Sequence, residues 1–132
     1  EHLTKSYPHV QQIHSEKVLA ISGEAGNFTI TTNKSSLQAK IVVIAIGSEN
    51  PFTIEGLESF IMPHQKAAPE KNRIQLKNTD HLVTEGIYAA GVLAGHRSQL
   101  SIAAGSGASI ATDILTLWNN GNPVQVHDAF GK

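Results

Sequence analysis

The spacing of hydrophobic and polar positions predicts a chain of short strands followed by one long helix. Residues 28–32, FTITT, alternate apolar and polar side chains, which is typical of a half-buried antiparallel strand. The strands on either side of it are 17–22, KVLAIS, and the beginning of 37–47. Polar, glycine-containing or serine-rich turns join them at 23–27 and 33–36. The pattern therefore predicts a three-stranded antiparallel meander.

Two continuously apolar runs in the chain each end at a glycine. They are 41–47, IVVIAIG, and 87–91, IYAAG, and neither contains a charged residue. Runs of this kind predict strands of a parallel sheet that are covered on both faces. Ligands bind open α/β sheets at the carboxyl ends of their strands, so Gly47 and Gly91 make room for a ligand. The alternative is that each glycine only makes a turn, and the pattern alone leaves both open.

The rest of the chain is interpreted as helices, one short strand and a connector. A short helix is expected to end just before Pro8, and HVQQI (9–13) is expected to be a strand. Residues 48–78 are weakly patterned and are interpreted as a connecting region. Residues 100–118 have a helical pattern, and NNGNP at 119–123 is a strong stop. The apolar helix face is expected to consist of Ala104, Gly107, Ala108, Ala111, Leu115 and Trp118, widened by Ile110, Ile114 and Leu117. The whole chain, 1–132, is expected to be one domain of the α/β class.

Composition removes several classes of function. The net charge is −1, and no basic patch for nucleic acid or a basic anchor for a membrane is visible. There is no cysteine, which excludes disulfides, thiolate metal sites and a redox C-x-x-C in this chain. The seven histidines are scattered without ligand spacing, so no metal site is expected. No serine elbow and no paired carboxylates are visible, and no catalytic side chain is assigned.

The start of the long helix, AAGSGAS at 103–109, has three interpretations. As a dinucleotide fingerprint it is weak, because bulky Ile110 stands where the third glycine belongs. As a helix amino end that faces a ligand it is stronger, since free amides there attract negative groups. The third interpretation is that the glycines serve only close packing.

Three ordered motifs resemble the closing half of the FAD domain in the thioredoxin reductase family of pyridine nucleotide–disulfide oxidoreductases. The A-T-G strand end of that family corresponds to Ala45-Ile46-Gly47, and its Y-A-A-G-D strand end to Tyr88 through Val92. Its R-Q-A-x-x-A-A-G-x-G segment corresponds to Arg97 through Gly107, with Ser98 inserted. The resemblance covers roughly residues 10 to 118 and includes a meander in the same place.

The resemblance implies an incomplete Rossmann-like FAD/NAD(P)-binding domain with a three-stranded meander and a long carboxyl-terminal helix. It implies FAD as the cofactor, with the adenine near Lys17 and Val18. The dinucleotide would lie beside Ala45, Gly47 and Gly91. The residues implied near the flavin ring are Gln99, Leu100, Ser101 and Ile102.

The departures from the family limit what is carried over. Val92 stands in place of the acidic residue that holds the ribityl hydroxyls, so only its backbone amide is offered. The NADPH domain, the C-x-x-C and the first G-x-G-x-x-G unit are not found in this sequence. The expectation is an FAD-only oxidoreductase-like protein that takes electrons from a protein donor or a small reductant, located in the cytoplasm. The alternatives left open are a non-catalytic binding or assembly module, and a fragment whose exposed sheet edge pairs with a second copy as a homo-oligomer.

Overall fold

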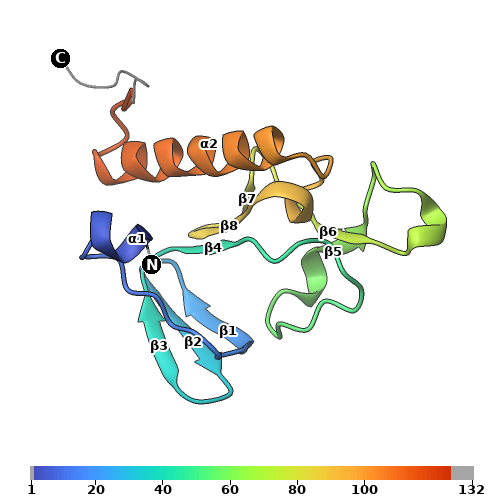
Figure 1. Cartoon of the computed structure of the whole chain (residues 1–132), viewed down its shortest axis with the longest axis horizontal. Helices are drawn as coiled ribbons and strands as arrows, with labels where there is room; N and C mark the ends of the chain where they lie inside the picture. The colour runs from blue at the N-terminus through green and yellow to red at the C-terminus, as the bar shows by residue number, and fades with distance from the viewer. Residues whose placement is uncertain (1, 126–132) are drawn as a thin grey trace.

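The computed structural model describes residues 2–125. One long helix, α2 (Leu100–Trp118), lies over one face of a three-stranded sheet, and a separate three-stranded meander lies on the other side (Figure 1). The first sheet has the order β4 (Val42–Ile44), β8 (Ile87–Ala89), β7 (Leu82–Thr84). The meander consists of β1 (Val18–Glu24), β2 (Asn27–Thr32) and β3 (Ser36–Ala39). The α/β class is therefore confirmed.

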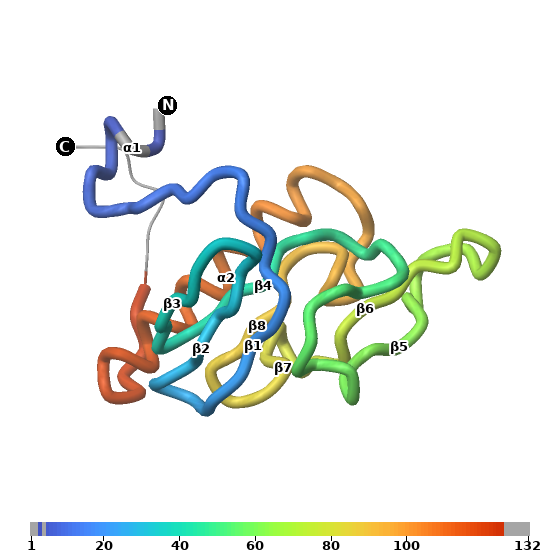
Figure 2. The backbone as a smooth tube through the Cα atoms, turned by 90° about the horizontal axis from the view of Figure 1, so that it is seen from below, coloured from blue at the N-terminus to red at the C-terminus, as the bar shows by residue number. Residues whose placement is uncertain are grey.

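Shorter elements complete the chain. An antiparallel ribbon of β5 (Ile61–Pro63) and β6 (Ile74–Leu76) extends away from the meander, as the view from below shows (Figure 2). A five-residue helix, α1 (His2–Ser6), precedes Pro8, as predicted. The remaining short helices are η1 (Glu58–Phe60), η2 (Pro69–Lys71) and η3 (Gly91–Ala94).

The meander forms where the alternating pattern predicts it. On β2, Phe28 and Thr32 are buried while Thr31 is exposed, so the period-2 pattern places one face against the core. β1 and β3 both pair with it in antiparallel register. The predicted strand at 9–13 is wrong, because these residues form no strand and all but Val10 are exposed.

The two apolar runs form adjacent parallel strands, as predicted, but only one is covered on both faces. All three residues of β8 are buried. On β4 the side chain of Val43 is 44% exposed, and Ile46 beyond the strand is 55% exposed. The prediction of double coverage is wrong for β4, an edge strand with β8 on one side only, because α2 covers β8 and leaves Val43 exposed.

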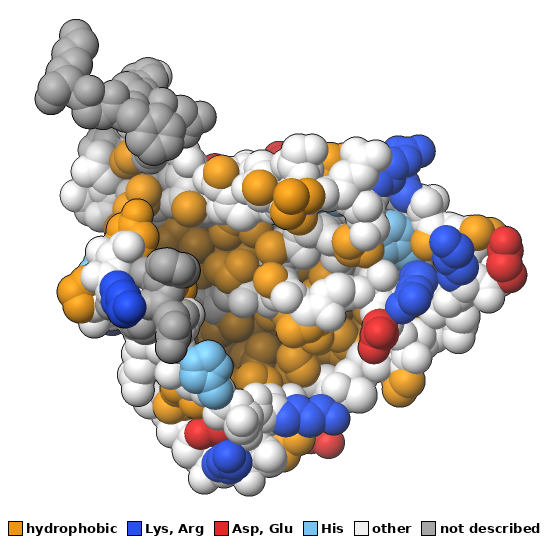
Figure 3. Space-filling model, in the orientation of Figure 1, with side chains coloured by type: hydrophobic (Ala, Val, Ile, Leu, Met, Phe, Trp, Pro, Cys, Tyr) orange, Lys and Arg blue, Asp and Glu red, His pale blue; other side chains and the backbone are white. Residues whose placement is uncertain are grey.

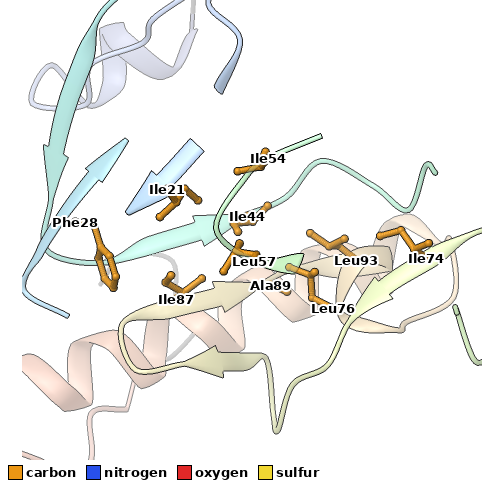
Figure 4. Close-up of a cluster of buried hydrophobic side chains, with 10 residues drawn as sticks. All are labelled: Ile21, Phe28, Ile44, Ile54, Leu57, Ile74, Leu76, Ile87, Ala89 and Leu93. Carbon is orange, nitrogen blue, oxygen red and sulfur yellow. The ribbon is translucent and has the colours of Figure 1, made fainter. Parts of the chain in front are cut away.

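One hydrophobic core joins the meander, the β4–β8–β7 sheet and the segment 48–78 (Figure 4). That segment was predicted to be a connector, and the prediction is wrong. Ile54 and Leu57 close the core beside the meander, and Ile74 and Leu76 of β6 extend it below η3. The approach is close enough that a methyl group at Gly56 would overlap the carbonyl of Ile21. The core residues are Ile21, Phe28, Ile44, Ile54, Leu57, Ile74, Leu76, Ile87, Ala89 and Leu93.

Helix α2 has the predicted limits, but its buried face is rotated away from the centre of the predicted one. Of the predicted face, Ile110 at its margin is buried, while the six central residues are exposed; the other buried position, Ser106, was not predicted. Ile110 is 1% exposed, and the hydroxyl of Ser106 accepts a hydrogen bond from the Gly91 amide at 2.8 Å. A branched apolar side chain and one specific hydrogen bond therefore set the rotation of the helix, rather than the stripe of small residues. The short tail at 124–132, VQVHDAFGK, is expected from the sequence to be exposed, and it lies mostly outside the described residues.

The burial of β6 yields the first prediction. Leu76 is fully buried, whereas Leu100, an equally large side chain, is 89% exposed. Replacing Leu76→Ala should lower the free energy of unfolding by about 2–5 kcal/mol through lost burial and the cavity left behind. Leu100→Ala, the matched control, should change it by less than about 0.5 kcal/mol. Chemical denaturation monitored by circular dichroism measures both, and equal effects would show that the segment 48–78 is not part of the core.

Candidate functional site

The carboxyl ends of β4 and β8 emerge side by side, because the two strands are parallel and adjacent. Val42, Val43 and Ile44 pair in order with Ile87, Tyr88 and Ala89. Gly47 and Gly91 follow these strands and therefore leave the same edge of the sheet. They line a cavity of about 230 Å³ together with Ala45, Ala90, Val92 and Ala103. We call these six residues the glycine cup.

The two glycines leave open the space that a side chain would fill. Gly47 has a φ of +82°, and a Cβ added there would meet nothing within 4 Å. Gly91 has a φ of +61°, and its nearest neighbour would be the Ala103 Cβ at 3.9 Å. Positive φ explains why glycine suits each turn, but the empty volume above both is a second feature that a turn alone does not require. The backbone of both strand ends is thus accessible to a ligand.

Helix α2 is fixed above the glycine cup by the hydrogen bond between the Gly91 amide and Ser106 Oγ. This contact places Ala103, in the first turn, on the wall of the cup. Gln99 at the N-cap makes no side-chain capping hydrogen bond, and the first turn holds no acidic residue. The amino end of α2 therefore keeps its partial positive charge next to the cup.

Two further cavities continue from the cup toward the beginning of β1. One, of about 300 Å³, is lined by both Lys17 and Gly47. The other, of about 390 Å³, is lined by Lys17, Val18 and Ala45 among mainly apolar side chains. Because neighbouring cavities share these residues, they form one trough across the open edge of β4. Figure 3 shows this part of the surface as a hollow with hydrophobic side chains on its floor.

The structure brings together six of the ten residues singled out from the sequence. Lys17, Val18, Ala45, Gly47, Gly91 and Val92 all line the trough or the cup. The other four line none of the cavities described here. Gln99, Leu100 and Ser101 are exposed and Ile102 is half-buried in the first turn of α2. They adjoin the cup through Ala103 rather than forming its wall.

His64 is a site residue that the sequence did not single out. It is 8% exposed, and its Nε2 lies 3.0 Å from the carbonyl oxygen of Val92. Its Nδ1 accepts a hydrogen bond from the Lys66 amide at 3.1 Å, so the ring is the neutral tautomer that donates from Nε2. The segment 48–78 is thereby attached to the turn that forms the cup. The sequence did not single out Ser106 as a site residue either, since no motif marks a serine whose hydroxyl accepts a hydrogen bond from the Gly91 amide.

A pair of histidines, His81 and His96, lies next to the end of β8. The Nε2 atoms of His81 and His96 are 2.8 Å apart, so one ring donates to the other. His81 Nδ1 is buried and has no hydrogen-bond partner among residues 2–125. Burial, with the charges of His81 and Lys66 as smaller causes, lowers the pKa of His96 below its usual value. Burial, then the Asp113 carboxylate, raises the pKa of Tyr88, which keeps that phenol neutral beneath α2.

No protein-family model matches this chain, and no curated protein matches it. The resemblance to the thioredoxin reductase family therefore rests on the three sequence motifs alone. Within residues 2–125 no three histidine, aspartate or glutamate side chains lie close enough to hold a metal ion.

Helix α2 is long and apolar enough to cross a membrane by length and composition alone. This is weak evidence, because a core helix passes the same test, although only 11% of the stretch is buried here. The absence of a membrane partner and a cytoplasmic location remain predictions.

The lowered pKa of His96 predicts a loss of stability in mild acid. The folded protein binds this proton less tightly than the unfolded chain, so the unfolded state gains protons first as the pH falls below the usual value of 6.5. The free energy of unfolding should be constant around neutral pH and should fall as the pH is lowered below the usual histidine value of 6.5. His96→Gln should flatten this dependence, while His14→Gln, at an exposed position outside the pair, should retain it. Denaturant titrations across this range check it, and an unchanged slope in His96→Gln would contradict it.

Proposed function

We propose that this chain forms the FAD-holding half-site of a flavoprotein oxidoreductase related to thioredoxin reductase but without a dithiol centre. The observation that carries the proposal is the glycine cup. Two parallel strand ends with open backbone meet there, under the uncapped amino end of a 19-residue helix. Extended dinucleotides are bound by close backbone approach and a positive helix end. This finer assignment, a Rossmann-like FAD domain, goes beyond the α/β class that the fold establishes.

The residues present fit such a cofactor over part of its length. Gly47 and Gly91 leave room for the dinucleotide, and the trough toward Lys17 and Val18 gives it a continuous, mainly apolar path. The carboxylate that would hold the ribityl hydroxyls is missing, because Val92 occupies its position. The Val92 carbonyl is also engaged by His64. The cofactor would therefore be held by shape and backbone more than by charged side chains.

The chemistry of such a protein comes from the flavin, which transfers electrons or hydride when it is bound. This chain's part is to position the ligand. The cup shields one side of the ligand, and the α2 amino end stabilises negative charge beside it. No side chain is assigned a catalytic role. Electrons would come from a donor protein or a small reductant that reaches the cup directly.

Binding of FAD can be tested with a helix substitution that fills the cup. Ala103 is exposed on α2 and lies opposite Gly91, so Ala103→Leu would occupy the cup without straining the backbone. The wild-type protein should bind added FAD, seen as quenched flavin fluorescence and a bound flavin absorbance spectrum. Ala103→Leu should weaken binding by about tenfold or more, since a side chain of that size takes up the space of the ligand.

The matched control is Ala111→Leu, which is exposed on the same helix two turns further on. It should bind FAD as the wild type does. Failure of the wild-type protein to bind FAD, or equal binding by Ala103→Leu, would contradict the proposal.

A second candidate function, a non-catalytic assembly module, is favoured by the free edge of β4. β4 pairs with β8 alone, and the adjoining trough presents apolar side chains such as Ile30, Val42 and Ile46. An edge strand with exposed hydrophobic residues is a template for another strand, including one from a second copy. In this case the trough would hold protein rather than cofactor.

The assembly candidate predicts self-association through β4. Val43→Lys introduces a charge at the centre of the free edge and should weaken self-association by about tenfold or more. Leu82→Lys, on the opposite edge strand β7 with a similar exposure of 40%, should leave it unchanged. Sedimentation velocity over a concentration series measures both. A wild-type protein that stays monomeric at all concentrations would contradict the assembly candidate.

A further inference from the structure

A second cavity, of about 580 Å³, adjoins the glycine cup and carries a different kind of surface. It shares Gly47 and Val92 with the cup, but most of its other lining residues are polar or charged. Its charged and titratable residues are Lys66, Lys71, Arg73, Arg97, His64, His96 and Glu49. We call this space the basic cavity.

The basic cavity has an excess of positively charged side chains, whereas the chain as a whole has none. The protein has 10 lysines and arginines against 11 aspartates and glutamates. Four of those cations, including both arginines of the sequence, line this cavity with a single carboxylate, Glu49. Figure 3 shows the blue side chains gathered at the right-hand side of the molecule, around a pale blue histidine. Like charges held together raise the local potential and attract anions.

The cations are held on well-built elements rather than on a loose surface. His64 anchors one wall through its hydrogen bond to Val92. The Arg73 carbonyl accepts a hydrogen bond from the His64 amide at 2.9 Å, which brings the two ends of the 64–73 loop together. Arg97 stands three residues before α2, so the positive end of that helix adds to the same potential.

The arginines are free to bind a ligand. Arg73 Nη1 is 4.0 Å from Glu49 Oε1, with the Arg73 side chain 42% and the Glu49 side chain 87% exposed. An exposed pair at this separation contributes little and is readily exchanged for a better acceptor. Arg97 has no ion-pair partner within residues 2–125. Guanidinium groups match the paired oxygens of phosphate and carboxylate groups.

We infer that the basic cavity binds a small molecule bearing a phosphate or carboxylate oxyanion with two or more negative charges. The volume suits a compact ligand rather than a polymer. The inference does not depend on the flavin proposal, because the cations line this space whatever occupies the cup. Where flavin is bound in the cup, the oxyanion would lie directly beside it across Gly47 and Val92.

The test is calorimetric titration of the purified protein with inorganic pyrophosphate, and separately with citrate, at low salt. At least one of them should bind saturably at one site per chain. Arg73→Gln and Arg97→Gln should each weaken that binding by roughly five- to tenfold, as expected for the loss of one charge-assisted contact. Glu49→Gln should strengthen it, because it removes the one carboxylate that competes for Arg73.

The charge-matched control is Lys34→Gln, which removes one positive charge from the turn of the meander and lines none of the cavities described here. It should bind the probes as the wild type does. Absence of saturable binding of both probes would overturn the inference. Equal weakening by Lys34→Gln and Arg97→Gln would overturn it too, since only the net charge would then matter.

A competition arm identifies the source of the oxyanion. If FAD displaces the bound probe, the cavity receives the pyrophosphate of the cofactor itself. If the probe binds equally with and without FAD, the cavity belongs to a separate anionic substrate. Circular dichroism of each variant confirms that these exposed substitutions leave the fold intact.

Discussion

The parallel pairing of β4 with β8 is the constraint on which the rest of the structure depends. It is short, with three residue pairs continued by the hydrogen bonds from Val42 N–H to the Gly86 carbonyl and from Ala90 N–H to the Ile44 carbonyl. Because the strands run in the same direction, their glycine ends meet at one edge. The Gly91 amide then orients α2 through Ser106, and the Val92 carbonyl receives His64. Every wall of the site is attached to this one junction.

So short a pairing does not hold by hydrogen bonds alone, because each contributes only about 1 kcal/mol net in water. Burial on one side of the sheet supplies what is missing. Ile44, Ile87 and Ala89 face a core that the meander and the segment 48–78 close from opposite ends. On the other face α2 covers β8 but leaves Val43 exposed. The sheet is thus well supported at its centre and open at the β4 edge, where the trough lies.

The elements that sequence reasoning recovered are those whose pattern is set by local chemistry. The alternation in β2, the apolar runs at β4 and β8, and the limits of α2 follow from periodicity and from the asparagine-glycine stop after Trp118. What it missed depends on distant partners. An apolar run cannot show that β4 lacks a neighbour, and small residues cannot outweigh Ile110 in choosing a helix face. The segment 48–78 has its buried residues at irregular spacing because short helices and a ribbon hold them, so no period marks it. The run HQKAAPEKNR, with three cations and a histidine in ten residues, was the available signal for the basic cavity.

Val92 lines both the glycine cup and the basic cavity, and this position gives a reason for a valine there. An aspartate at this position would place a carboxylate between the glycine cup and the basic cavity, where Arg97 and His96 are neighbouring wall residues. Such a carboxylate would pair with the Arg97 guanidinium and lower the positive potential that an incoming oxyanion needs. A valine offers no such carboxylate and leaves Arg97 without this partner. On the proposed function, the lost contact to the dinucleotide in the cup and the retained positive charge in the adjoining cavity are therefore two consequences of one residue.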